Sequence, residues 1–538
     1  MIWHIFRKDA RLLWPGAALV ATLQICAAIP HHLMDHGVRT VQLQILGDLL
    51  SALALLGAMV VVVVAIHQDP VPGARQDWLI RPIRRRDLAA AKLLFVVLMV
   101  QLPIWLVDVG IALVDGFALP AACVAAAGRN IGIFCEFALP AMMIGVITST
   151  FVEAFVVAAL ALVSYVGLFY VVLALLLGVK ATVGGTGAEW IVSAAFYVLV
   201  LIGTAVVLAL QYAARRTALA RGLIAVGGAL VIGVAFLPWP LAFSMQAALS
   251  PEPAAARAIA VAFDPQSGRY PLPLGAAPAV TSALHLPLRL SDLPADSVVF
   301  LDRADVRITA LDGTTLYQGR TSISADGLGS IPDAQFEVRT GRGDGPTHSL
   351  YQRIYLPTAV YARLADRPVR MSIDYSLTLF GTAHLFSVPA TGARETLPGL
   401  GRCGTSIDAE GDDVVIGCLS TARQNRCLSI YLEDPATGLR NPEVKGCLPN
   451  YAPAIFTQLW PDTINRAGRE VPFFDRSGLV HFAVDGSRLS GAKLMITTFD
   501  PRDHFTRHVN TPVVKLSDFS GVAAAAAPAP AVTPPPRE

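Results

Sequence analysis

The sequence predicts an α-helical membrane domain of about seven spans, followed by an all-β, sandwich-like soluble domain. Only 15% of the residues are charged and the mean hydropathy is +0.55, whereas soluble domains carry about 25% charged residues. The charges are also unevenly distributed, with 26 in residues 1–250 and 56 in residues 251–538. The chain therefore joins a hydrocarbon-compatible half to a polar half.

Long apolar runs mark the membrane half. A bilayer core of about 30 Å needs roughly 20 apolar residues per helix, and only a helix satisfies its own backbone groups there. The runs of this length lie near residues 12–30, 45–66, 93–114, 131–150, 154–177, 190–212 and 222–241. The fourth run is the weakest, and the stretch 116–128, which contains Pro120, is compatible with a broken or re-entrant element.

The distribution of Lys and Arg predicts how these spans are oriented. If the N-terminus is cytoplasmic, twelve basic residues fall in the inside segments and three in the outside segments of the membrane half. The twelve are Arg7, Lys8, Arg11, Arg75, Arg81, Arg84, Arg85, Arg86, Lys92, Arg215, Arg216 and Arg221. Seven crossings then place the polar half outside.

Four of the seven cysteines favour the same orientation. Cys403, Cys418, Cys427 and Cys447 fall within 45 residues of the polar half, and none belongs to a C-x-x-C pair, which argues against zinc. An even number of cysteines in a polar, loop-rich stretch indicates two disulfides and an oxidising compartment. Of the three possible connectivities, we expect Cys403–Cys418 with Cys427–Cys447.

The pattern of the polar half changes to alternation at period two. Apolar and polar residues alternate from Met371 to Leu379, and Asp312-Gly313 and Asp485-Gly486 are typical of hairpin turns. Residues 251–520 therefore predict a β-sandwich, or two in tandem that divide near 388–400. The Ala- and Pro-rich residues 521–538 predict a disordered tail.

Signatures of catalysis are absent from the sequence. It contains no phosphate-binding P-loop, no H-E-x-x-H and no G-x-S-x-G. We therefore expect no enzymatic activity, cofactor or metal, and an exported hydrolase has no motif to support it. The net charge of +2 predicts no general attraction to nucleic acid.

The most informative segment is the predicted inside loop from His67 to Lys92. It combines two Pro-marked turns, an apolar patch at Trp78 and a dense Arg cluster. An apolar centre rimmed by charge is typical of a docking surface, whereas Arg clusters alone are typical of an anchor at the inner membrane face. These residues by themselves leave both interpretations open.

Two stretches of the membrane half are recognisable. One is the N-terminal segment from Met1 to Pro15. The other combines Asp69-Pro70, Gly73, Trp78-Leu79, Arg81-Pro82-Ile83 and Arg86, and leads into Ala91-Lys92-Leu93-Leu94. Both resemble permease subunits of bacterial ABC transporters of the second export class. The resemblance covers about residues 1–220.

This resemblance implies a transport function that a separate cytoplasmic ATPase drives from the inner membrane of a bacterium. Residues 1–11 would form an amphipathic elbow helix on the inner surface of the lipid bilayer, ahead of a membrane domain at 12–241. A second permease copy or a sister permease would complete the path. The ATPase-coupling loop would contain Asp69, Gly73, Trp78, Arg81, Pro82 and Arg86. The chain departs from the six-span plan of the family by its seventh helix and its large periplasmic or extracellular domain.

Two ionisable residues lie away from the ends of the predicted spans, where they are expensive and usually functional or paired, whereas Asp48 lies near the end of the second span. Asp108 lies in the third span and Glu136 in the fourth. They are candidates for lining a translocation path. The alternative is local compensation, with Glu136 two turns from Arg129 and Asp108 reaching interfacial water.

A second function of a different class fits the same sequence. The chain could be a membrane-anchored extracytoplasmic binding or sensory module, whose spans only anchor and signal. Seven spans are more than an anchor needs, which favours the permease.

Overall fold

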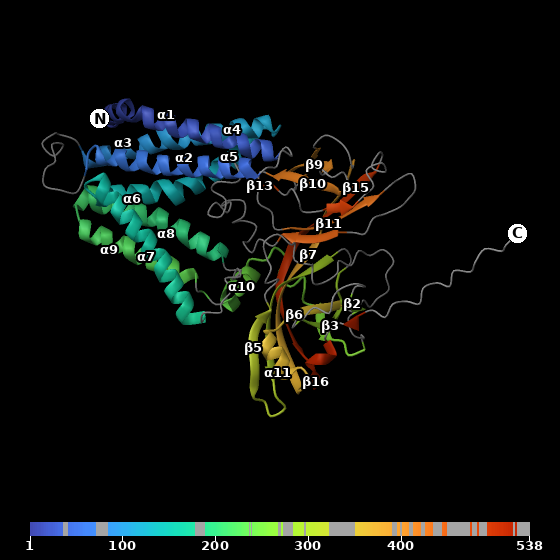
Figure 1. Cartoon of the computed structure of the whole chain (residues 1–538). Helices are drawn as coiled ribbons and strands as arrows, with labels where there is room; N and C mark the ends of the chain where they lie inside the picture. Colours follow the sequence, from blue (N-terminus) through green and yellow to red (C-terminus); the bar gives the residue numbers. More distant parts are fainter. Residues whose placement is uncertain are drawn as a thin grey trace.

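The computed structural model combines a bundle of long helices with a region rich in β-strands (Figure 1). It describes residues 1–35, 41–70, 84–177, 189–235, 237, 239–266, 271–272, 283–294, 297–321, 350–389, 395–398, 401–407, 413–420, 426–433, 444–448, 474–475, 481–483, 492–519 and 522–523.

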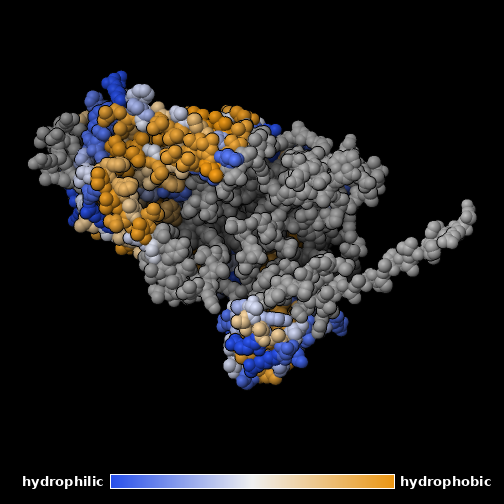
Figure 2. Space-filling model, viewed as in Figure 1, coloured by the Kyte–Doolittle hydropathy of each residue, from blue (hydrophilic) through white to orange (hydrophobic). Residues whose placement is uncertain are grey.

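The helices belong to the membrane half of the chain. They are α1 (Ile2–Asp35), α2 (Val41–His67), α3 (Arg85–Phe95), η2 (Val96–Gln101), α4 (Leu102–Val114), α5 (Leu119–Ile133), η3 (Phe134–Ala138), α6 (Leu139–Ile147), α7 (Phe151–Leu177), α8 (Glu189–Ala209), η4 (Leu210–Ala214), α9 (Thr217–Ala235) and α10 (Trp239–Ala248). The elements η2, η3 and η4 are π-helical turns that continue the helices beside them. Figure 2 shows apolar side chains over the visible flank of the bundle, as expected for a surface in contact with lipid.

Six helical stretches in the described part of the chain are long and apolar enough to cross a bilayer. They are Ile2–Pro30, Ile45–His67, Arg85–Val114, Leu119–Ile147, Ala194–Ala214 and Thr217–Val234. The expected fifth span, near 154–177, coincides with α7, in which the apolar stretch Phe151–Ser164 is shorter than the six others. The structure therefore shows six of the seven expected spans by length and composition.

The fourth span begins earlier than the sequence predicts. The helix runs from Leu119 through the π-helical turn to Ile147, so 116–128 holds the start of a continuous span and no re-entrant element. The apolar run is broken at Arg129, but this side chain is buried and its Nη1 lies 2.6 Å from Asp108 Oδ2. Pro120 stands in the first turn of α5, where a missing N–H costs nothing.

The N-terminal residues also differ from expectation. Helix α1 runs unbroken from Ile2 to Asp35, so residues 1–11 are the first turns of the spanning helix and form no separate elbow. Ile5 and Phe6 are buried in the bundle core. Helix α1 packs closely on α2 at Gly16, where an added Cβ atom would approach Val61 to 3.2 Å.

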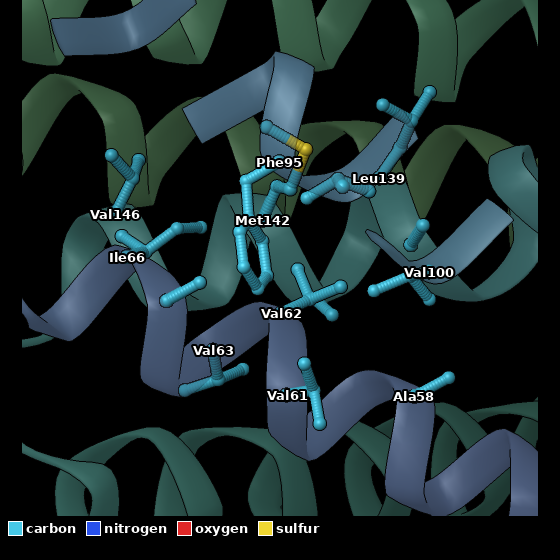
Figure 3. Close-up of a cluster of buried hydrophobic side chains, with 14 of the residues drawn as sticks. Ala58, Val61, Val62, Val63, Ile66, Phe95, Val100, Leu139, Met142 and Val146 are labelled. Carbon is cyan, nitrogen blue, oxygen red and sulfur yellow. The ribbon is translucent and has the colours of Figure 1, made fainter. Parts of the chain in front are cut away.

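The core of the bundle is formed mainly by α2, α3 with η2, and α6. Figure 3 shows Phe95 and Met142 pointing toward Val62 from two different helices. All three side chains are buried, and Ile66 packs one turn further along α2. Because lipid tails are as apolar as these side chains, such contacts stabilise a membrane bundle mainly through close van der Waals packing.

The helix termini that carry the basic residues predicted to lie inside are found at one end of the bundle. Arg85 Nη1 donates to the carbonyl oxygen of Ala213 at 3.0 Å, and Arg221 Nη2 donates to that of Ile147 at 2.9 Å. These contacts join the starts of α3 and α9 to the ends of η4 and α6. We call this the basic end; it is the end that carries the N-terminus (Figure 1). Since α6 and α8 both lead to the basic end, α7 between them must lead away from it.

The strands follow in the second half of the chain. They are β1 (Ala260–Phe263), β2 (Pro271–Leu272), β3 (Ala283–Ser291), β4 (Ser297–Thr309), β5 (Thr315–Thr321), β6 (Leu350–Tyr355), β7 (Pro368–Pro389), β8 (Glu395–Leu397), β9 (Gly401–Ile407), β10 (Asp413–Ser420), β11 (Arg426–Glu433), β12 (Val444–Leu448), β13 (Phe474–Asp475), β14 (His481–Ala483), β15 (Lys493–Asn510), β16 (Val514–Lys515) and β17 (Val522–Ala523). Two short helices, α11 (Thr358–Leu364) and the 3₁₀ turn η6 (Leu516–Phe519), lie among them.

The largest sheet has seven strands in the order β12-β11-β15-β7-β4-β5, with β16 also paired to β7. Long strands β7 and β15 pair from Lys493 opposite Pro389 to Asn510 opposite Ser372. This sheet takes strands from both sides of the expected break at 388–400, because β15 returns along the whole of β7. A three-stranded sheet, β1-β3-β6, shares a buried core with it. A sandwich architecture stays a prediction.

The local strand patterns agree with the sequence. Met371, Ile373, Tyr375, Leu377 and Leu379 are all buried on β7. The predicted turn at residues 312–313 joins β4 to β5, and its glycine has a φ of +86°, which a side chain disfavours.

Two predictions fall wholly or partly outside the described residues. The predicted turn at 485–486 is one of them. Of the expected tail at 521–538, the structure describes Val522–Ala523, which pairs with Pro271–Leu272 as β17 with β2.

Helix α10 attaches the membrane half to the large sheet. Trp239 Nε1 donates to Ser376 Oγ at 2.9 Å, and the Arg303 guanidinium lies 5.5 Å from the centre of the Trp239 ring. Phe243 stacks on Trp239 and meets His504 edge-on at 6.0 Å. Figure 1 shows α10 between the bundle and the long strands. A second contact joins the Arg402 side chain of β9 to the backbone carbonyl of Asp115, in the turn after α4.

A buried polar chain lies beside α10 in the sheet. The Thr378 hydroxyl is 2.7 Å from Asp302 Oδ2 and 2.7 Å from His504 Nδ1. Burial raises the pKa of Asp302 to about 8, against a smaller lowering by the Thr378 hydrogen bond. Burial also lowers the pKa of His504 to about 4, despite the charge of Asp503. At neutral pH Asp302 is therefore protonated and His504 is neutral.

The shifted pKa values of Asp302 and His504 predict that the folding stability of the protein falls between pH 6.5 and 8. Above pH 3.8 and up to about pH 8, folded Asp302 keeps a proton that the unfolded chain has lost, so stability falls as pH rises. His504 has the opposite effect on folding stability between about pH 4 and 6.5, because only the unfolded chain protonates it there. The net loss of stability therefore falls between pH 6.5 and 8 and amounts to about 2 kcal/mol. We expect Asp302→Asn to flatten the decline in melting temperature of the purified chain.

The matched control is Asp305→Asn, which removes a half-exposed carboxylate from the same strand. It should keep the decline of the unsubstituted chain. The same pH dependence in the Asp302→Asn variant would contradict the assignment.

Candidate functional site

Four charged side chains meet just inside the basic end. Lys92 Nζ lies 2.7 Å from Asp9 Oδ2 and 2.8 Å from Asp69 Oδ2. Lys8 Nζ lies 2.9 Å from the same Asp69 oxygen, and 3.5 Å from Asp9 Oδ1. Two cations and two anions therefore alternate around a closed circuit, which we call the ion-pair network.

The network lies largely within the protein. Asp9 is 0% exposed and Lys92 is 1% exposed, whereas Lys8 reaches the surface. The Asp9 side chain points from α1 into the bundle, whereas the neighbouring Lys8 side chain points outward. Burial acts to raise the pKa of Asp69, but the Lys92 charge and the hydrogen bonds from Lys92 and Lys8 outweigh it, so the pKa is lowered. Asp69 is therefore anionic at neutral pH.

The network joins three helices at the base of the predicted coupling loop. Asp69 follows the end of α2, Lys92 belongs to α3 just beyond the loop, and Lys8 and Asp9 belong to α1. Both sides of the loop base are thus tied to the N-terminal helix. Of the predicted loop residues, Asp69 lies in the network and Arg86 is exposed in the first turn of α3. Gly73, Trp78, Arg81 and Pro82 lie outside the described residues.

Further contacts tie the remaining helix ends together. His67 Nε2 lies 3.0 Å from Thr148 Oγ1, which joins α2 to the end of α6. Arg221 Nη2 lies 2.7 Å from Glu153 Oε1, which joins α9 to the start of α7. A displacement of the loop base therefore acts on a set of interlinked helix ends.

The sequence pattern does not predict the network. Lys92 is predicted only as an inside basic residue, and Asp9 has no predicted role. The available signal was the position of Lys92 within an apolar helix, where a charge is expensive unless a partner neutralises it. The partner could not be named, because Asp9 is 83 residues away in the chain.

Asp108 and Glu136 lie in two separate contacts. Asp108 pairs with Arg129 across α4 and α5 at 2.6 Å. Glu136 Oε1 accepts a hydrogen bond from the Tyr197 hydroxyl at 2.5 Å, which joins η3 to α8. Arg129 therefore compensates Asp108, not Glu136. Glu136 lies in a π-helical turn, a feature common at functional sites. A role in lining a path stays a prediction for both.

The cysteines of the polar half lie at matched positions of two strand pairs. Cys403 of β9 is opposite Cys418 of β10, and Cys427 of β11 is opposite Cys447 of β12. Directly opposite residues of an antiparallel pair have Cβ atoms about 5 Å apart, and a disulfide needs about 4 Å. The backbone register is thus the one that the expected connectivity requires.

Comparison with family models, curated proteins and solved structures finds no match to this chain.

Proposed function

We propose that this chain is the permease subunit of an ABC transporter, with a translocation path driven by a separate cytoplasmic ATPase. The observation that supports it best is the ion-pair network at the base of the loop. The network ties both sides of the loop base to α1, which would let a displacement of the loop act on that helix. The resemblance of residues 1–220 to such permeases points the same way.

In this proposal the ATPase docks on the loop 70–84 and on the exposed arginines beside it. Arg84, Arg85 and Arg86 form a cationic rim at the start of α3. Carboxylates on the ATPase complement this rim and steer its association. When the ATPase closes on ATP, displacement of the loop passes through Asp69 to α1 and α3. A second copy of this chain, or a sister permease, forms the other wall of the path.

The proposed location is the inner membrane of a bacterium, with the basic end in the cytoplasm. The β-rich region then lies in the periplasm or outside the cell. An oxidising compartment would allow Cys403–Cys418 and Cys427–Cys447 to form disulfides across their strand pairs. These two disulfide bonds would then stabilise the β9–β10 and β11–β12 strand pairs.

Coupling is tested by the ATPase activity of the complex purified from the native host through a tag on this chain. We expect Asp69→Asn to lower the activity several-fold while the ATPase still copurifies, because the loop keeps its surface but loses its link to Lys92. Asp87→Asn is the matched control, since it removes a carboxylate one residue beyond Arg86 and outside the network.

Two results would contradict the proposal. One is the absence of any nucleotide-hydrolysing partner after crosslinking, which would favour a membrane-anchored binding or sensory module. The other is an equal effect of the Asp69→Asn and Asp87→Asn variants on activity.

Orientation is tested with single cysteines introduced at exposed positions. A membrane-impermeant maleimide should add a label to Leu385→Cys in intact spheroplasts, and to Arg216→Cys only after permeabilisation, because these residues lie in β7 and at the basic end. The reverse pattern would contradict the proposed orientation. Mass spectrometry of an unreduced digest should show the two linked peptide pairs, and free thiols at all four cysteines would exclude the disulfides.

A further inference from the structure

A basic groove follows the outer face of α1 at the basic end. His4, Arg7, Lys8, Arg11 and Leu12 border an open hollow of about 480 Å³. Their spacing of three and four residues places them on one side of the helix. This side faces away from Ile5, Phe6 and Asp9, which are buried against the bundle.

The charge of the groove is not neutralised within the described part of the chain. Asp9, the nearest carboxylate in sequence, points into the bundle and pairs with Lys92. Lys8 shares its charge with Asp69. Arg7 and Arg11, one helical turn apart, form no ion pair with any described residue. The groove therefore presents two uncompensated guanidinium groups and a third, partly compensated cation.

The same face of α1 turns apolar immediately below the groove. Leu12 and Leu19 are exposed, Leu19 by 60%, and Leu19 lies about 12 Å along the axis from Arg11. Trp3 and Trp14 flank the groove and are also exposed. Indole rings at this position are typical of the membrane–water interface. A helix α1 that crosses the bilayer would carry the groove at headgroup depth, directly above a surface that suits an acyl chain.

We infer that the basic groove binds the phosphate headgroup of an anionic phospholipid, with an acyl chain against Leu12 and Leu19. Guanidinium groups bind phosphate with paired, charge-assisted hydrogen bonds. Anionic lipids of the cytoplasmic leaflet offer this phosphate at the depth of the groove. The apolar strip beneath favours a lipid over a soluble phosphate. The inference depends on α1 crossing the membrane, and not on the transport function.

Lipid binding also bears on the ion-pair network. Lys8 borders the groove on one side and pairs with Asp69 on the other. A bound headgroup therefore lies next to a residue of the network.

The test is native mass spectrometry of the full chain, titrated with phosphatidylglycerol or phosphatidylcholine in detergent. We expect tight binding of phosphatidylglycerol, which Arg7→Gln with Arg11→Gln weakens about tenfold or more. The matched control is Arg84→Gln with Arg216→Gln, which removes the same charge from exposed positions at the same end but off the groove. This control should retain the binding.

Two additional arms keep the test decisive. Arg7→Lys with Arg11→Lys should restore a large part of the binding, which a merely misfolded chain would not do. Inorganic phosphate at the same concentration should not displace phosphatidylglycerol. If the groove variant and the control variant weaken binding equally, the binding reflects general electrostatic attraction, and the proposed site is wrong. Equal binding of phosphatidylcholine, or displacement by inorganic phosphate, would overturn the lipid assignment.

Discussion

The ion pair between Lys92 and Asp9 is the interaction on which the arrangement of the membrane half depends. An ammonium group buried among apolar helices costs several kcal/mol unless a carboxylate meets it. Lys92 is met by Asp9 from α1 and by Asp69 from the end of α2. These contacts require the first turns of α1 to stand against α3, and they fix the loop base between the two. The basic end is assembled around this requirement.

The opposite end of the bundle holds a second buried ion pair and the contacts to the β-rich region. Asp108 and Arg129 neutralise each other between α4 and α5. Beyond them, α10 packs Trp239 and Phe243 against the large sheet. The sheet itself is continuous, because β7 and β15 pair over most of their length. A change at the basic end can therefore reach the β-rich region through the helices, by way of α10 or of the contact between Arg402 and the Asp115 carbonyl.

The sequence predicts features that depend on local pattern. The apolar runs locate the helices, and the alternation from Met371 to Leu379 locates the buried face of β7. The matched positions of Cys403 and Cys418 also follow from a short hairpin. Each of these signals needs only neighbours within about twenty residues.

The features that the sequence does not predict all depend on distant partners. Arg129 interrupts an apolar run, and only its pairing with Asp108 lets the span begin at Leu119. The basic residues of α1 suggest a surface helix until Asp9 is seen to pair with Lys92. A single sheet across 388–400 requires β15 to return to β7, which no local pattern indicates. Long-range pairing, not the identity of the residues, decides these points.

The most direct measurement is a double-mutant comparison at Asp9 and Lys92, by thermal unfolding of the purified chain in detergent. Lys92→Met leaves the buried Asp9 carboxylate with no described cation closer than Lys8 Nζ at 3.5 Å, which should destabilise the bundle by about 3–5 kcal/mol. Asp9→Asn together with Lys92→Met removes both charges and should recover most of that loss. The single variant Asp9→Asn completes the comparison. If the double variant loses as much stability as Lys92→Met and Asp9→Asn lose together, the central role of this ion pair is contradicted.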